Sequence, residues 1–306
     1  MLDYRVFRAN ITSQNGEDGI IREILDRLNI LEGWCVEFGA WDGKHLSNTW
    51  NLWHNLGWSA VLIEGESQRA KNLQVSTSEF SNVFCLCSYV SHVGKNKLNN
   101  ILKSTNIPYD FDILSIDVDG DDWHIWNAFT EYQPKVVICE FSMWFPAHVS
   151  VVSEPGNENL ACSALSLLEL GISKGYELVC CNNVNAIFVR SDLVKKLNLE
   201  GTSKERLVLT HDRFDSMYLS PKIFEKITSL YRKYGYFEEI EHLATEWLEK
   251  SIANFGYSSE IQIICKSIII QSPKLKLSYL VLADFFRSVN FIEKSERAKK
   301  ILDLYN

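Results

Sequence analysis

The chain has 306 residues, of which 46% are apolar and 23% are charged, and its formal net charge is −8. Residues 1–202 carry 15 Lys and Arg against 25 Asp and Glu, so this part lacks the basic surface that nucleic-acid binding needs. The first residues include no apolar signal segment, and no apolar run approaches the roughly 18 residues of a membrane span. We therefore expect a cytoplasmic protein with no membrane span and no nucleic-acid partner.

Eight cysteines are spread over the chain without a C-x-x-C pair and without the spacing of a zinc site. Several of them fall inside apolar runs that have the composition of buried strands. Small core residues in a reducing compartment explain this pattern better than disulfides or a bound metal.

Short apolar runs alternate with helical stretches as far as about residue 195, which is typical of an α/β fold with a parallel sheet covered on both faces. Helices are expected at about 16–29 and 159–174. The expected strands are Trp34–Phe38, Ser59–Glu64, Asn82–Cys87, Ile113–Asp117, Lys135–Glu140, Tyr176–Cys180 and Ala186–Arg190. Seven strands ending in a hairpin match the mostly parallel, Rossmann-like methyltransferase sheet rather than a six-stranded dinucleotide-binding sheet.

After about residue 202 the strand-like runs stop and helical patterns follow. Ser220 and Pro221 form a capping and first-turn pair, and Gly235 has the position of a C-cap glycine. Later helices are expected at about 237–254, 258–271, 274–288 and 291–304. The last two loosely resemble one tetratricopeptide-type hairpin. We therefore expect a sheet domain (1–202) and a helical domain (203–306) that serves packing, homo-oligomer formation or partner binding.

The most informative motif is Val36-Glu37-Phe38-Gly39-Ala40-Trp41-Asp42-Gly43. Gly39 and Gly43 allow the loop after the first strand to turn sharply and a ligand to approach the main chain. Glu37 is placed to hold a cationic or hydroxyl group of that ligand. A dinucleotide site needs G-x-G-x-x-G, and the middle glycine is missing here. The motif therefore favours S-adenosylmethionine over a dinucleotide.

Four of the expected strands carry a carboxylate at their last or second-last residue, namely Glu37, Glu64, Asp117 and Glu140. In an open parallel sheet, ligands bind beyond the carboxyl ends of the strands, where the strand order reverses. One carboxylate at such a place is often only a helix cap, but four at the same edge indicate a site. Glu64 is placed to bind both hydroxyls of a ribose.

The densest acidic segment is Asp117-Val118-Asp119-Gly120-Asp121-Asp122. Carboxylates this close either share a divalent cation or hold the pKa of one member high enough for it to act as a base. The position of the glycine, and Ala128 where a calcium loop has Glu, exclude an EF-hand. Asp117, Asp119 and Asp121 remain candidate ligands of one hard cation such as Mg²⁺.

Two histidines and one polar segment lie next to these motifs. His124 and His45 could accept a proton at neutral pH, although a lone histidine is more often structural. The segment Ser13-Gln14-Asn15-Gly16-Glu17-Asp18 starts the first expected helix, and Ser13 or Asn15 could cap it. Its polar density also suits a lid over the methionine end of the cofactor.

Together these segments resemble the FkbM-type S-adenosylmethionine-dependent methyltransferases. The resemblance lies in residues 13–18, 36–43, 63–64, 116–121 and 138–140, and it covers about residues 10–195. It implies methylation of hydroxyl groups in sugars, polyketides or other secondary metabolites, with bacterial relatives in surface-glycan biosynthesis. The family usually has Ile-Asp-Val-Glu-Gly at the fourth strand. This chain has Asp119 in place of that Glu, which keeps the charge and shortens the reach.

We therefore expect an O-methyltransferase that acts on a sugar, a nucleotide-linked small molecule or a surface-glycan precursor. Cofactor binding is assigned to Gln14, Asp18, Glu37, Gly39, Ala40, Gly43, Glu64 and Asp117, and catalysis to Asp117, Asp119, His124 and Glu140. Two alternatives stay open. One is another nucleotide-dependent transferase on the same sheet, and the other is a non-catalytic, cofactor-binding adaptor that works through its helical tail.

Overall fold

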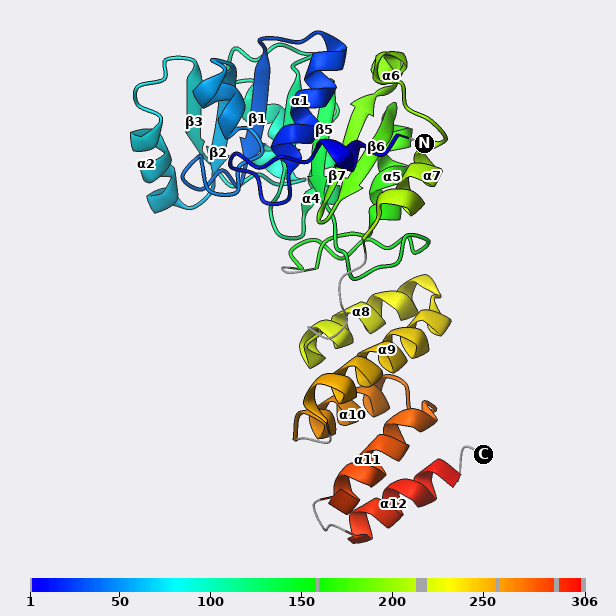
Figure 1. The fold of residues 1–306 in the computed structure, drawn as a ribbon. Coiled ribbons are helices and arrows are strands. Elements are labelled where there is room, and N and C mark those ends of the chain that lie inside the picture. Colours follow the sequence, from blue (N-terminus) through cyan, green and yellow to red (C-terminus); the bar gives the residue numbers. More distant parts are fainter. Residues whose placement is uncertain (1, 158–159, 213–218, 257–258, 289–291, 304–306) are drawn as a thin grey trace. The chain divides into compact units, whose positions relative to one another are not determined.

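The fold was analysed in a computed structural model, which describes residues 2–157, 160–212, 219–256, 259–288 and 292–303 (Figure 1). The chain divides into two compact units, Met1–Arg213 and Phe214–Asn306. Four residues at the ends of expected helices lie outside the described residues, namely Asn159, Ser258, Phe291 and Leu304. None of the described helices combines the length and the apolar composition of a membrane-spanning segment.

The first unit is built on a seven-stranded sheet in the order β3-β2-β1-β4-β5-β7-β6. Its strands are β1 (Trp34–Phe38), β2 (Ser59–Glu64), β3 (Val83–Cys87), β4 (Ile113–Ile116), β5 (Val136–Glu140), β6 (Tyr176–Asn182) and β7 (Asn185–Arg190). β1 to β5 pair in parallel, whereas β7 is antiparallel to both β5 and β6. This confirms the predicted mostly parallel, Rossmann-like methyltransferase sheet with its closing hairpin.

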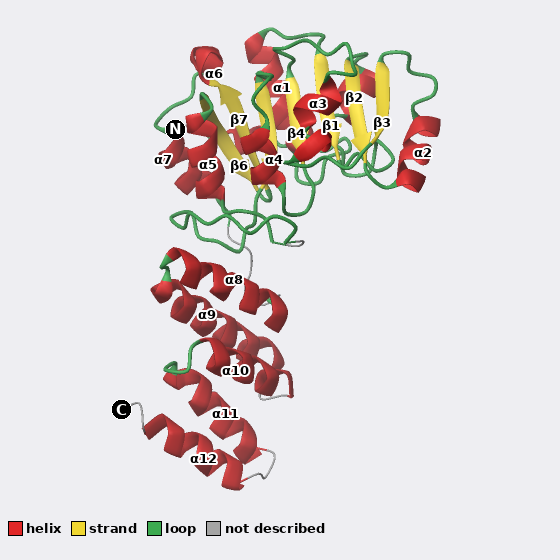
Figure 2. Ribbon diagram, turned by 180° about the vertical axis from the view of Figure 1, so that it is seen from behind, coloured by secondary structure: helices red, strands yellow, loops and turns green. Residues whose placement is uncertain are grey.

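Helices cover both faces of the sheet because successive strand residues point to opposite sides. Val36 and Phe38 of β1 belong to a core with α3 (Leu98–Leu102), α4 (Asp122–Ala128) and α5 (Ala164–Ser173). Cys35 belongs to the opposite core with α1 (Glu17–Leu28) and α2 (Ser67–Ser76). Figures 1 and 2 show these faces from the two sides. All eight cysteines are free and six of them are buried, as the composition predicted.

The start of α1 differs from the prediction. Gly16, with a left-handed φ of 95°, occupies the N-cap, and neither Ser13 nor Asn15 does. Ser13 Oγ nevertheless accepts a hydrogen bond from Asp18 N at 3.1 Å, so it satisfies one of the free amide groups at the helix start. The polar segment thus stabilises the helix end from outside the cap position.

The first compact unit continues past residue 202, where the sequence pattern changes. After α6 (Val194–Leu197), α7 (Ser203–Thr210) packs on β6. Arg206 of α7 is buried, donates to the Leu178 carbonyl of β6 at 2.6 Å and pairs with the Glu177 carboxylate at 2.8 Å. These contacts join α7 to the sheet.

The described residues of the second unit form helices joined by short turns. Its helices are α8 (Pro221–Tyr234), α9 (Phe237–Phe255), α10 (Ser259–Gln271), α11 (Lys276–Ser288) and α12 (Ile292–Asp303). The cap predictions for α8 are confirmed, because Ser220 Oγ accepts from Ile223 N and Gly235 takes a left-handed φ of 81°. Phe224 and Trp247 are buried in the second unit and pack with ring centroids 4.8 Å apart. The tetratricopeptide-type likeness of the last two helices stays a prediction.

Candidate functional site

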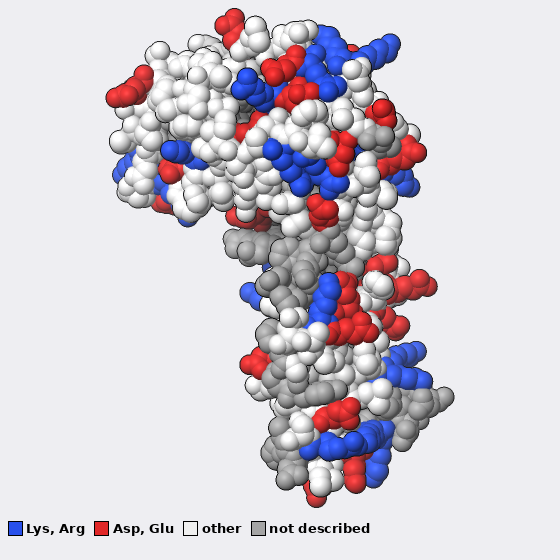
Figure 3. Space-filling view, in the orientation of Figure 1, with Lys and Arg blue, Asp and Glu red and all other residues white. Residues whose placement is uncertain are grey.

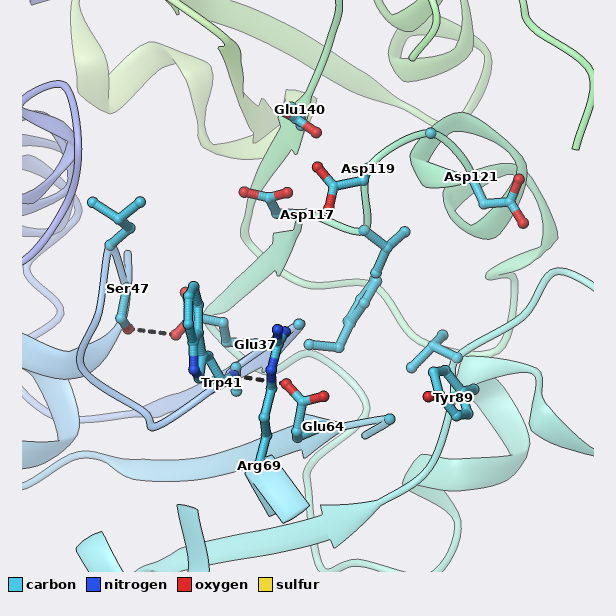
Figure 4. Close-up of a pocket in the computed structure, with 18 of the residues that line it drawn as sticks. Glu37, Trp41, Ser47, Glu64, Arg69, Tyr89, Asp117, Asp119, Asp121 and Glu140 are labelled. Atoms are coloured by element: carbon cyan, nitrogen blue, oxygen red, sulfur yellow. Dashed lines mark hydrogen bonds between the residues drawn. The ribbon is translucent and has the colours of Figure 1, made fainter. Parts of the chain in front are cut away.

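A cavity of about 820 Å³ opens beyond the carboxyl ends of β1, β2, β4 and β5 (Figure 4). The strand order reverses between β1 and β4, which is where open parallel sheets bind their ligands. A cavity of this size is large enough for a nucleoside cofactor. Nine of the predicted site residues line it, namely Gln14, Glu37, Gly39, Ala40, Glu64, Asp117, Asp119, Asp121 and Glu140.

The two glycines of the loop after β1 have different roles. Gly39 lies at the cavity with φ 73°, and a Cβ there would lie 2.4 Å from the Asp117 carbonyl oxygen. It therefore lets the loop approach the end of β4. Gly43, with φ 83°, faces Leu73 and Trp53 in the core and does not line the cavity. The structure places Gly43 as a turn residue rather than a cofactor contact.

Glu37 anchors the loop that follows β1. Its buried carboxylate accepts hydrogen bonds from Ser47 Oγ at 2.5 Å, Thr49 Oγ1 at 2.7 Å and Asn48 N at 2.9 Å. Burial raises the pKa of Glu37, and these hydrogen bonds counteract part of that rise. Because three protein donors hold this carboxylate, its main role is to fix the cavity wall.

Glu64 holds two backbone amides from two different segments. Its Oε2 accepts from Trp41 N at 2.9 Å and its Oε1 accepts from Glu66 N at 2.8 Å. Both oxygens keep a second lone pair, and the residue lines the cavity. Glu64 is thus a fixed acceptor pair at the end of β2, as ribose binding requires.

Asp117, Asp119 and Glu140 lie together at the ends of β4 and β5 (Figure 4). Asp117 and Glu140 share a hydrogen bond, and burial together with the charge of Asp117 raises the pKa of Glu140 to about 10. Glu140 is therefore protonated at neutral pH and donates to the Asp117 carboxylate. Among the described residues, no Lys or Arg pairs with these three groups, so negative charge remains at this wall.

The acidic segment after β4 is held together by Asp122. This buried carboxylate accepts from Val118 N at 2.9 Å and Gly120 N at 3.0 Å. Burial and the charge of Asp117 raise the pKa of Asp122 to about 7. One of its oxygens lies within 4.8 Å of one oxygen each of Asp117 and Glu140. Asp122 was missed as a site residue because a helix-start Asp is ordinarily only a cap.

The predicted metal ligands Asp117, Asp119 and Asp121 are not the group that converges. Asp121 Oδ1 accepts from Gly156 N at 2.7 Å, and its side chain points away from Asp117 and Glu140 in Figure 4. Within the described part of the chain, the carboxylates close enough to share one cation are Asp117, Asp122 and Glu140.

Besides Gly43, two further predicted site residues, Asp18 and His124, lie off the cavity wall. Asp18 is buried and accepts from the backbone amides of residues 11–13 at 2.8–2.9 Å and from Ser13 Oγ at 2.7 Å. It holds the segment that brings Gln14 to the cavity. His124 does not line the cavity, and its Nε2 lies 2.9 Å from the Ser153 carbonyl oxygen. Both contacts are structural.

Sequence reasoning missed two lining residues that come from helix α2 and the loop after β3. The Arg69 guanidinium lies over the Trp41 ring, 4.5 Å from its centroid. Tyr89, two residues after β3, covers Gly65, where a Cβ would lie 2.3 Å from the Tyr89 ring. A signal was available for Tyr89, because it follows a strand end at the same edge of the sheet.

Comparison with known proteins shows that no family model and no curated protein matches the sequence. The fold is similar to a SAM-dependent methyltransferase from Aquifex aeolicus, with 11% identity and a TM-score of 0.33 over 55% of this chain and 86% of that one. It is also similar to the glycopeptide N-methyltransferase MtfA complexed with (S)-adenosyl-L-methionine, with 11% identity and a TM-score of 0.36 over 59% and 95%. For M. capricolum TrmK in complex with S-adenosyl-homocysteine, the identity is 13% and the TM-score is 0.34, over 91% of this chain and 97% of that one. Likenesses this distant carry no information on activity, and the FkbM-type family stays a prediction.

Proposed function

We propose that this protein is an S-adenosylmethionine-dependent methyltransferase. The observation that carries the proposal is the cavity wall, on which five carboxylates and the protonated Glu140 face one arginine, Arg69, among the described lining residues. Such a wall attracts a nucleoside that carries positive charge and repels the phosphates of a dinucleotide. In addition, the glycine loop after β1 leads into a π-helix at Asn51–Asn55 rather than directly into an α-helix whose N-terminus could bind a pyrophosphate.

The residues present fit this cofactor. Glu64 offers two fixed acceptor oxygens to a ribose, and Gly65 and Tyr89 lie next to it at the ends of β2 and β3 for the base. Asp117 offers a carboxylate to the positively charged methionine end, close to Gly39 and Gln14. When bound, S-adenosylmethionine supplies an electrophilic methyl group.

The acceptor is proposed to react through a hydroxyl group. Asp119 and Asp117 would hydrogen-bond that hydroxyl and Asp119 would accept its proton, while the protonated Glu140 orients Asp117. Asn157 and Asp121 add neutral and acidic acceptors to the same wall. A sugar, or another small glycan precursor rich in hydroxyl groups, therefore suits this wall better than a strongly anionic acceptor.

A divalent cation is the alternative to a shared proton at this wall. The convergence of Asp117, Asp122 and Glu140 within 4.8 Å favours it as a second element of the proposal. Bound there, Mg²⁺ would orient an acceptor oxygen. Isothermal titration with Mg²⁺ and Mn²⁺ tests this element, because a shared proton alone predicts no binding heat.

Thermal-shift measurements test the cofactor directly. A ligand that binds only the folded state raises its melting temperature, so S-adenosylhomocysteine should stabilise the protein whereas NAD and ATP should not. Stabilisation by NAD or ATP alone would favour another nucleotide-dependent transferase. Stabilisation by S-adenosylhomocysteine without methyl transfer to any sugar in an acceptor panel would favour the non-catalytic adaptor.

On the face shown in Figure 3, Lys and Arg are interspersed with Asp and Glu in both units rather than gathered into one large patch. Nucleic-acid binding draws most of its strength from Lys and Arg facing phosphates. The acceptor is accordingly proposed to be a small molecule, with no nucleic acid involved.

A further inference from the structure

Trp41 has an unusual backbone for a large residue. Its φ is 48°, in the left-handed region that bulky side chains rarely adopt. Among the described non-glycine residues with positive φ, the others are Asn or Asp except for Leu46, and Leu46 also lines the cavity. Strain of this kind is retained where the surrounding structure imposes it, and it concentrates at binding sites.

The Trp41 side chain is also held in place while much of it stays accessible. It is 44% exposed, although a buried position would be the favourable place for an indole. The Arg69 guanidinium lies over one region of the ring at 4.5 Å, and the His45 ring packs edge-on at 4.7 Å. The indole is therefore oriented by its neighbours before any ligand binds.

A hydrogen bond from the Trp41 backbone amide connects Trp41 to the Glu64 side chain. The Trp41 N–H donates to Glu64 Oε2 at 2.9 Å, so the indole is carried by the same peptide that fixes the carboxylate at the end of β2. Figure 4 shows Trp41, Arg69 and Glu64 side by side at the cavity. A ligand hydroxyl bound to Glu64 would accordingly lie within reach of the indole.

We propose that Trp41, backed by Arg69, is a cofactor-binding residue whose indole forms a wall of the ribose subsite. The proposal rests on the proposed cofactor and adds a recognition element outside the strand ends. The indole excludes water from the hydrogen bonds between Glu64 and the ribose and packs against the sugar ring. Arg69 stabilises the indole by a cation–π contact.

Isothermal titration with S-adenosylhomocysteine tests this assignment. Trp41→Ala should weaken binding by about tenfold or more, whereas Trp41→Phe, which keeps an aromatic face, should stay within about threefold of the wild type. The affinity of Arg69→Met for S-adenosylhomocysteine should lie between those of Trp41→Ala and Trp41→Phe. Trp50→Ala is the matched control, since Trp50 stacks on His54 at 3.9 Å outside the cavity lining and should leave binding unchanged.

A second ligand tests the nucleoside part of the cofactor without its amino-acid end. 5′-Methylthioadenosine keeps the ribose and adenine but lacks the amino-acid end, so Trp41→Ala should weaken its binding by the same factor. The change in tryptophan fluorescence on binding S-adenosylhomocysteine should also be smaller in Trp41→Phe than in the wild type. A Trp41→Ala variant that binds both ligands like the wild type, or loses affinity no more than Trp50→Ala does, overturns the proposal. If the wild type itself does not bind S-adenosylhomocysteine, the proposed function fails first.

Discussion

Glu140 holds a proton in the folded protein that it would lose on unfolding at neutral pH. Burial and the charge of Asp117 raise its pKa from the ordinary 4.5 to about 10. Between these two values the folded state binds the proton more strongly than the unfolded state does, so this group lowers stability as the pH rises. The hydrogen bond between the Glu140 acid and the Asp117 carboxylate is therefore kept at the site although protonated Glu140 lowers the stability of the protein as the pH rises.

Glu140→Gln removes this titration and keeps a donor toward Asp117. We expect the melting temperature of the variant, relative to that of the wild type, to increase steadily from about pH 5 to about pH 9. The exposed Glu79→Gln is the control and should follow the wild type across this range. If the Glu140→Gln and wild-type melting curves stay parallel at every pH, Glu140 is not protonated in the folded state.

Glu64 is the residue on which ribose recognition depends. Glu64→Ala removes both acceptor oxygens, and we expect calorimetry to detect no binding of S-adenosylhomocysteine. The variant also loses the bonds to Trp41 N and Glu66 N, so its fold must be checked by circular dichroism and melting. A folded variant with unchanged affinity would remove Glu64 from the ribose role.

Asp117 and Asp121 differ in how free their carboxylates are. Asp121 Oδ1 is already bound to Gly156 N, whereas Asp117 faces the cavity next to Glu140. Asp117→Asn should consequently weaken S-adenosylhomocysteine binding more than Asp121→Asn does. The two variants carry the same chemical change, so they control for each other in one calorimetric series. The reverse order would show that the cofactor lies closer to the acidic loop than to the end of β4.

At the scale of elements, local sequence signals located β1 and β2 at their observed bounds, since each is a short apolar run. The carboxylates at strand ends could be predicted for the same reason, because strand direction alone brings them to one edge. The contact between Trp41 and Arg69 could not be predicted this way. It depends on the left-handed backbone of Trp41 and on how α2 packs, and neither feature produces a periodic pattern in the sequence.

Helix α7 shows how one long-range contact decides where an element belongs. Arg206 is 2% exposed and donates to Leu178 O, Gly201 O and the Glu177 carboxylate. Arg206→Met would leave these acceptors unpaired, and we expect the free energy of unfolding to fall by about 3 kcal/mol or more. Arg22→Met, at a side chain that is 70% exposed, is the control and should change it by less than about 0.5 kcal/mol. Chemical denaturation measures both, and equal effects would mean that α7 does not support the sheet.

At the scale of the whole molecule, the division into two compact units leads us to expect that the site forms without the helical unit. The described residues that line the cavity all belong to the first unit, and α7 buries Leu207 in the core of the sheet. A chain ending at Arg213 should therefore melt cooperatively and bind S-adenosylhomocysteine within about threefold of the full chain.

A chain ending at Thr202 keeps every cavity residue but loses α7, so it exposes the apolar surface of β6 and leaves the Leu178 and Glu177 acceptors without Arg206. We expect this shorter chain to be markedly less stable than the chain ending at Arg213, by several kcal/mol from the lost apolar burial and the unpaired polar groups. Melting and calorimetry on the chains ending at Thr202 and at Arg213 separate the contribution of α7 from that of the helical unit. Equal stability of the two chains would place the end of the folding unit at the change in sequence pattern, whereas loss of binding in both would make the helical unit part of the site.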